Sequence, residues 1–102
     1  MSESQHKIMT WAQETFGPAD PSAVFRKFHD EVGELTRAFD SGDKRAIRKE
    51  CGDVLVMLFR LTDHADGDLV AILEDVMAEN RAREWNLNSD GTAQHVGAEA
   101  VR

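Results

Sequence analysis

Two pairs of carboxylates with helical spacing constrain the fold of this chain more than any other feature. Glu31 and Glu34 lie in the segment HDEVGEL, and Glu50 and Asp53 lie in KECGDVL. Each pair is spaced i, i+3, so both of its members lie on one face of a helix. The polar segment 40–43 between the pairs predicts a turn. The two helices would then form an antiparallel hairpin, with residue 31 level with 53 and residue 34 level with 50.

Four carboxylates gathered in this way repel one another unless protons or cations intervene. In the second pair, Glu50 directly precedes the most apolar segment of the chain, residues 51–61, and Asp53 lies within it. An acid without a partner is costly there. We therefore predict a site for a hard divalent cation, Mg²⁺ or alternatively Mn²⁺, with all four acids as ligands. The competing interpretation is a solvated acidic face, which is the usual role of paired acids on helices.

The hydrophobic pattern predicts an all-α fold of four helices and contains no clear strand signal. The expected helices span residues 3–15, 21–39, 43–64 and 69–85. Asp20 and Pro21 predict the start of the second helix, as an N-cap followed by proline in the first turn. Cys51 is expected as a small core residue of the third helix. In the fourth helix, the residues expected to face inward are Leu69, Ile72, Leu73 and Val76.

The predicted domain covers residues 1–86, and residues 87–102 are expected to form a polar, flexible tail with a turn at 88–91. A single domain of 102 residues has a limited core, so we expect the four-helix bundle to be completed by oligomerisation, as a homodimer or homotetramer.

Charge and composition exclude several classes of partner. The chain has 12 basic and 19 acidic residues and a net charge of −7, which argues against binding a nucleic-acid polymer or an anionic membrane. It contains one cysteine, so no intrachain disulfide can form. The expected location is cytoplasmic, because the sequence contains no signal peptide and no apolar run of the ~20 residues that a membrane span needs.

A basic segment closes the fourth helix. Asn80 and Arg83 are one turn apart, and the arginine offers a fork of donors for a phosphate. The alternative is that the basic residues only complement the helix C-terminus electrostatically. Trp11 and Trp85 could stack on a nucleobase, or serve as large core residues.

These motifs together resemble the MazG-like members of the all-α nucleoside triphosphate pyrophosphohydrolases. The ordered set is an early tryptophan segment at 11–17, ExxE at 31–34, ExxD at 50–53 with Gly52 and an aliphatic run, and the segment 80–85. The segment 80–85 is similar to the closing basic segment of a subgroup that acts on dATP and dGTP. The resemblance extends along most of the chain.

The resemblance implies the catalytic residues and the reaction. Glu31, Glu34, Glu50 and Asp53 would be the catalytic Mg²⁺ ligands, and Asn80 and Arg83 would contact the substrate. Relatives commonly carry a lysine one turn before the asparagine. This chain has Val76 there, and Lys27 is the alternative phosphate contact.

The implied reaction is hydrolysis of a (deoxy)nucleoside triphosphate to the monophosphate and pyrophosphate, as in house-cleaning of the nucleotide pool. The opposing hypothesis is a catalytically inactive helical homo-oligomer that binds a nucleotide or another partner. The missing lysine favours this second hypothesis, and the retention of all four acids favours the enzyme.

Overall fold

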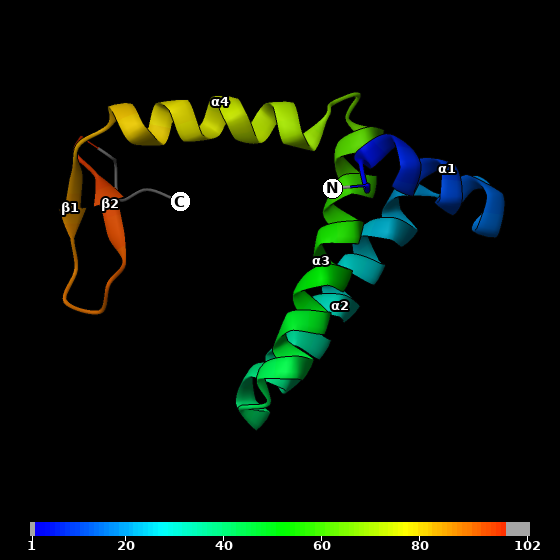
Figure 1. Ribbon diagram of the computed structural model, residues 1–102, viewed down its shortest axis with the longest axis horizontal. Coiled ribbons are helices and arrows are strands. Elements are labelled where there is room, and N and C mark those ends of the chain that lie inside the picture. The colour runs from blue at the N-terminus through cyan, green and yellow to red at the C-terminus, as the bar shows by residue number, and fades with distance from the viewer. Residues whose placement is uncertain (1, 98–102) are drawn as a thin grey trace. The chain divides into compact units, whose positions relative to one another are not determined.

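The computed structural model describes residues 2–97 and is mainly helical (Figure 1). Its elements are α1 (Gln5–Phe16), α2 (Pro21–Ser41), α3 (Lys44–His64), α4 (Leu69–Ala82), β1 (Trp85–Leu87) and β2 (Ala93–His95). The chain divides into two compact units, residues 1–70 and 71–102. The all-α class and the four expected helices are thus confirmed. Within the described range, none of the helices combines the length and apolarity needed to cross a bilayer.

Helices α2 and α3 form the predicted antiparallel hairpin and lie side by side in Figure 1. Asp20 caps α2 by accepting a hydrogen bond from the backbone of Ala23 (3.3 Å), and proline follows in the first turn. The helix ends at Gly42, whose φ of 74° is left-handed and favours glycine. Asp43 then caps α3 through Oδ1, which accepts from the backbone N–H groups of Arg45 and Ala46. These caps fix the turn, and with it the register of the two helices.

The first unit is also held together by a buried side chain that the sequence analysis did not single out. Gln5 of α1 is 4% exposed. Its amide nitrogen donates to the carbonyl of Gly67 (2.7 Å), and its amide oxygen accepts from the backbone N–H of Leu69 (2.8 Å). A buried amide is stable only when it is hydrogen-bonded, so Gln5 ties α1 to the connection between α3 and α4.

The core of the chain is small, and its position on α3 differs from the expectation. The buried apolar residues are Ala12, Val24, Ala38, Met57 and Phe59. Cys51 is exposed, so its predicted role in the core is wrong for the single chain. Leu55 and Leu58 are also exposed, by 46% and 37%. Because α3 is apolar on several sides, its pattern did not reveal which side meets α2.

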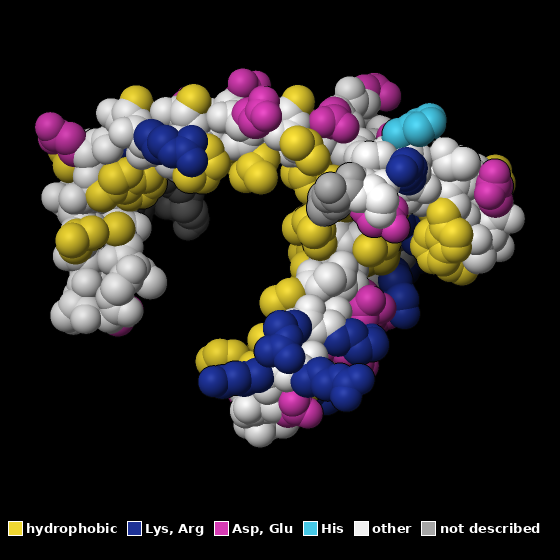
Figure 2. All heavy atoms as spheres, viewed as in Figure 1, with side chains coloured by type: hydrophobic (Ala, Val, Ile, Leu, Met, Phe, Trp, Pro, Cys, Tyr) yellow, Lys and Arg dark blue, Asp and Glu magenta, His cyan; other side chains and the backbone are white. Residues whose placement is uncertain are grey.

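Helix α4 contains no buried residue. The prediction that its apolar residues face inward is wrong within the single chain for Ile72, Leu73 and Val76, which are 40%, 54% and 43% exposed. Leu69, the fourth residue of that prediction, is partly buried. Apolar side chains are visible along α4 and along α3 in Figure 2. The helix also ends at Ala82, three residues earlier than expected.

The segment after α4 forms a two-stranded antiparallel hairpin, where the sequence analysis expected no strand. Trp85 pairs with His95, and Leu87 pairs with Ala93. The predicted turn at 88–91 is confirmed as the connection. Asp90 accepts hydrogen bonds from the Thr92 hydroxyl and backbone N–H, and these bonds lower the pKa of the Asp90 carboxyl below its ordinary value. The strands are three residues long, too short for visible alternation, and β1 crosses the predicted boundary at 86–87.

Candidate active site

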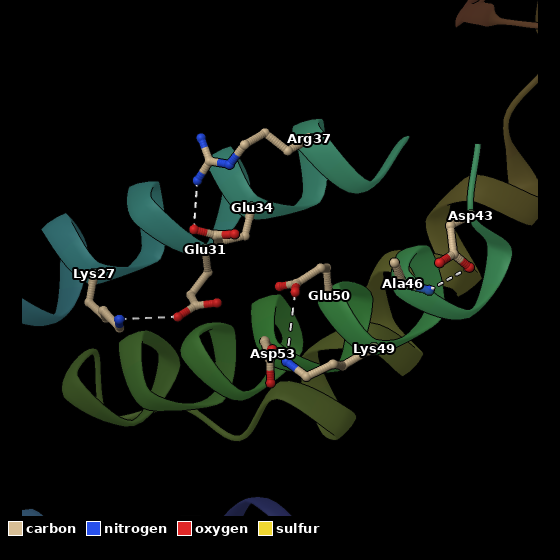
Figure 3. A network of polar contacts seen from close by, with 9 residues as sticks. All are labelled: Lys27, Glu31, Glu34, Arg37, Asp43, Ala46, Lys49, Glu50 and Asp53. Atoms are coloured by element: carbon tan, nitrogen blue, oxygen red, sulfur yellow. Dashed lines mark hydrogen bonds and ion pairs between the residues drawn. The ribbon is translucent and has the colours of Figure 1, made fainter. Parts of the chain in front are cut away.

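Three of the four predicted acids come together across the α2–α3 hairpin. Glu31, Glu50 and Asp53 each offer a carboxylate oxygen, and these three atoms lie within 4.8 Å of one another. In Figure 3 the side chains of Glu31 from α2 and Glu50 from α3 point toward each other. All three residues are partly buried. The expectation that residue 31 lies close to residue 53 is confirmed, and we call these three residues the acid cluster.

Glu34, the fourth predicted ligand, is not part of this cluster. Its side chain is 52% exposed and accepts a 2.6 Å hydrogen bond from the guanidinium of Arg37. The two residues are spaced i, i+3 on α2, where such pairs form readily. Arg37 therefore offers Glu34 a local partner, and a role of Glu34 in metal binding stays a prediction.

Two lysines neutralise part of the charge of the acid cluster. The ammonium of Lys27 lies 3.3 Å from Glu31. The ammonium of Lys49 lies 2.8 Å from Asp53 and 3.7 Å from Glu50. The hydrogen bond and charge of Asp53, with the charge of Glu50, raise the pKa of Lys49 above its ordinary value. Lys49 is therefore fully charged at neutral pH.

The carboxylate of Glu50 has one oxygen that no protein group satisfies. Its Oε2 atom is buried and has no hydrogen-bond partner, although a buried polar atom is costly to leave unpaired. Glu50 belongs to the acid cluster, in which two helices contribute three carboxylate donors. Hard divalent cations such as Mg²⁺ and Mn²⁺ prefer oxygen ligands of this kind. The residues present therefore fit a divalent metal ion.

A cavity of about 170 Å³ lies in the same unit, where α1 meets the beginning of α2 and the end of α3. Arg60 lines it, and the guanidinium of Arg60 lies 5.6 Å from the ring centre of Phe16. The Nε atom of Arg60 is buried and has no hydrogen-bond partner. The other lining residues are Met9, Ala12, Gln13, Gly17, Ala19, Pro21, Val24, Leu61, Asp63 and His64. The lining is mixed, because the side chains of Gln13, Arg60, Asp63 and His64 lie among the apolar ones.

The remaining predicted substrate contacts have other neighbours. Trp11 is 51% exposed and packs edge-to-face on Phe16, with ring centres 5.3 Å apart. In the second unit, the indole N–H of Trp85 donates to the carbonyl of Asn80 (2.8 Å), and its ring meets His95 edge-on. Arg83 follows α4 and is exposed. The roles of these residues in substrate binding stay predictions.

A helical hairpin that brings three carboxylates together, one of them with a buried unpaired oxygen, defines a class of all-α proteins with an acidic, metal-compatible centre. The family model of the MazG nucleotide pyrophosphohydrolase domain matches residues 20–83, which is more than half of the chain. The chain therefore belongs to the MazG nucleotide pyrophosphohydrolase family and is a hydrolase that acts on acid anhydrides. The matched segment includes all four acids, Asn80 and Arg83.

Two solved structures resemble this chain. A cyanophage S-2L MazG-like pyrophosphohydrolase, bound to dGDP and three catalytic Mn²⁺ ions per active site, is 25% identical, with a TM-score of 0.71 over 93% of this chain and 91% of that one. The Bacillus-conserved MazG protein, a nucleotide pyrophosphohydrolase, is also 25% identical, with a TM-score of 0.63 over 78% and 92%. No curated protein sequence matches the chain significantly.

Proposed function

We propose that this protein hydrolyses a (deoxy)nucleoside triphosphate to the monophosphate and pyrophosphate, with Mg²⁺ or Mn²⁺ held by Glu31, Glu50 and Asp53. The observation that carries the proposal is the acid cluster, which offers three carboxylate oxygens within 4.8 Å of one another. The buried, unpaired Oε2 atom of Glu50 supports it. The three Mn²⁺ ions and dGDP in the cyanophage relative support the same assignment.

Each part of the site has a separate task in this reaction. When bound, the divalent metal would orient the triphosphate, screen its charge and lower the pKa of the attacking water. Glu34 lies one turn from Glu31 and outside the acid cluster, so we assign it either to the metal, after release from Arg37, or to the water as a hydrogen-bond acceptor. The water attacks the α-phosphorus. The bond between this phosphorus and the oxygen that bridges it to the β-phosphorus breaks, and pyrophosphate leaves.

We assign the nucleobase to the cavity at the end of the hairpin. Val24 lines the cavity and precedes Glu31 by two helical turns on α2, while Arg60 follows Asp53 by two turns on α3. At a rise of 1.5 Å per residue, this places the cavity about 10 Å along the hairpin from the acid cluster. The unpaired Nε–H of Arg60 would donate to an acceptor on the base. Trp11, on α1 of the same unit, is the candidate for stacking on it.

Arg83 is proposed to contact a phosphate oxygen together with Asn80. Replacing Arg83 with alanine is expected to raise the KM for the nucleotide about tenfold, because a charge-assisted hydrogen bond is lost. The affinity for Mn²⁺ alone should not change, since the partner of Arg83 is the phosphate. Arg81→Ala, which removes the same charge from the end of α4, is the matched control. Equal effects of the two substitutions would show that only the general charge of this segment matters.

The protein is proposed to act as a homo-oligomer. Among the described residues no large side chain is fully buried, and the exposed apolar side chains lie on both α3 and α4. A second copy of the chain would cover such faces and complete a four-helix bundle.

The reaction is tested by incubating the purified protein with Mg²⁺ and a panel of ribonucleoside and deoxyribonucleoside triphosphates. The expected products are the monophosphate and pyrophosphate, identified by ³¹P NMR. Release of inorganic phosphate and a diphosphate would mean that a different bond is cut. Binding of nucleotide without any hydrolysis by metal-loaded protein would instead support the catalytically inactive module.

A further inference from the structure

Every member of the acid cluster has a lysine partner on its own helix. Lys27 precedes Glu31 by one turn and lies 3.3 Å from it. Lys49 lies 2.8 Å from Asp53 and 3.7 Å from Glu50, so a single ammonium group serves two acids (Figure 3). The two lysine side chains are 59% and 70% exposed, whereas Glu31 and Glu50 are only 16% and 15% exposed. Asp53 is more open, with a side chain that is 41% exposed. Glu31 and Glu50 are therefore held between the helices, and the lysines reach the cluster from solvent on flexible stems.

This arrangement has two consequences for charge. The carboxylates of the cluster outnumber the lysines by one, so the ion pairs relieve most of the repulsion among the acids when no metal is bound. A divalent cation that binds the same carboxylates would oppose the ammonium of Lys49, because both positive charges need Asp53 and Glu50. Binding of the cation would also make the local charge positive overall. The lysines then require a new anionic partner.

We propose that Lys49 and Lys27 exchange ion-pair partners during substrate binding: they leave the carboxylates when a divalent metal binds and pair with phosphate oxygens of the nucleotide. This inference rests on the proposed function. A lysine has three donors and a flexible stem, and both lysines are exposed enough to turn. The exchange would supply cationic phosphate contacts in a chain whose net charge is −7.

The exchange predicts opposite effects of one substitution on two affinities. Lys49→Met keeps much of the apolar stem and removes the charge. The affinity for Mn²⁺ alone, measured by calorimetry without nucleotide, should increase about threefold, because an exposed ion pair no longer competes with the metal. In saturating Mn²⁺, the affinity for α,β-methylene-dGTP and α,β-methylene-dATP should decrease about tenfold, because a charged phosphate contact is lost. Lys27→Met should change both affinities in the same directions.

Lys44→Met is the matched control, because Lys44 begins the same helix and forms no ion pair among the residues that the structure describes. It should leave both affinities at their wild-type values. A decrease in both affinities for Lys49→Met would mean that the lysine only supports the geometry of the acids, and the proposal would be overturned. Unchanged affinities would overturn it as well. Circular dichroism of each variant and Lys49→Gln as a second substitution exclude an effect of misfolding.

The same measurements separate this inference from the proposed function. If the wild-type protein binds Mn²⁺ and the analogues but releases no pyrophosphate from any triphosphate, the proposed hydrolysis fails and opposite shifts for Lys49→Met would still support the exchange. If pyrophosphate is released and the two affinities do not shift in opposite directions, only the exchange fails.

Discussion

Replacing Glu50 with glutamine is expected to lower the rate of pyrophosphate release at least about a hundredfold, because the substitution removes a ligand from the ion that bears the transition-state charge. The same change should stabilise the metal-free protein. The side chain of Glu50 is 15% exposed and its Oε2 atom is buried without a partner, so a neutral amide relieves both desolvation and repulsion from Glu31 and Asp53. A gain of about 1 kcal/mol corresponds to a rise of about 4–8 °C in melting temperature.

Thermal unfolding with and without millimolar Mg²⁺ tests this expectation together with the activity assay. A cation that binds only the native state raises the melting temperature of the wild type, and Glu50→Gln should remove most of this rise. Glu74→Gln, at an exposed position of α4, is the matched control and should keep the wild-type response. A metal response that persists in Glu50→Gln would argue against the acid cluster as the binding site.

Replacing both Leu55 and Leu58 with glutamine is expected to weaken self-association at least about a hundredfold, because burying one leucine contributes about 1.5–3 kcal/mol. Both side chains are exposed in the single chain, by 46% and 37%, so the hairpin of α2 and α3 should survive the change. Light scattering at micromolar concentration measures the effect as a decrease in mass.

Leu87→Gln is the control for this experiment, since Leu87 is 82% exposed and belongs to β1. It should leave the mass unchanged. A wild-type protein with the mass of a single chain would refute the proposed oligomer directly. An oligomer that survives the double substitution would place the contact elsewhere, for example on the exposed residues of α4.

The sequence was sufficient to predict the hairpin because its signals are local. The i, i+3 spacing of the acids sets their face, and the turn at 40–43 fixes which residues lie level across it. Glu34 shows the limit of that argument. Spacing places Glu34 on the same face as Glu31. Arg37, however, follows Glu34 by three residues, and its guanidinium lies 2.6 Å from the Glu34 carboxylate. Competition between an ion pair on one helix and a contact between two helices cannot be resolved from spacing.

Other differences arise where the decisive contact is distant or the pattern is ambiguous. Gln5 is buried because its amide meets backbone groups of residues 67 and 69, and no local pattern reports such a contact. Cys51 is exposed although it was expected in the core, because α3 is apolar on more than one side. The strands at 85–87 and 93–95 have only three residues each, so their pairing depends on the turn and on packing of Trp85 against His95.

A crystal structure of the protein grown with Mn²⁺, with anomalous scattering data collected near the manganese absorption edge, tests the central claim most directly. The account predicts an anomalous peak bonded to carboxylate oxygens of Glu31, Glu50 and Asp53, with Lys49 no longer in contact with Asp53. Crystals that contain Mn²⁺ elsewhere but show no peak at the acid cluster would contradict this prediction. So would a structure in which Lys49 is still paired with Asp53 and no metal lies between the helices.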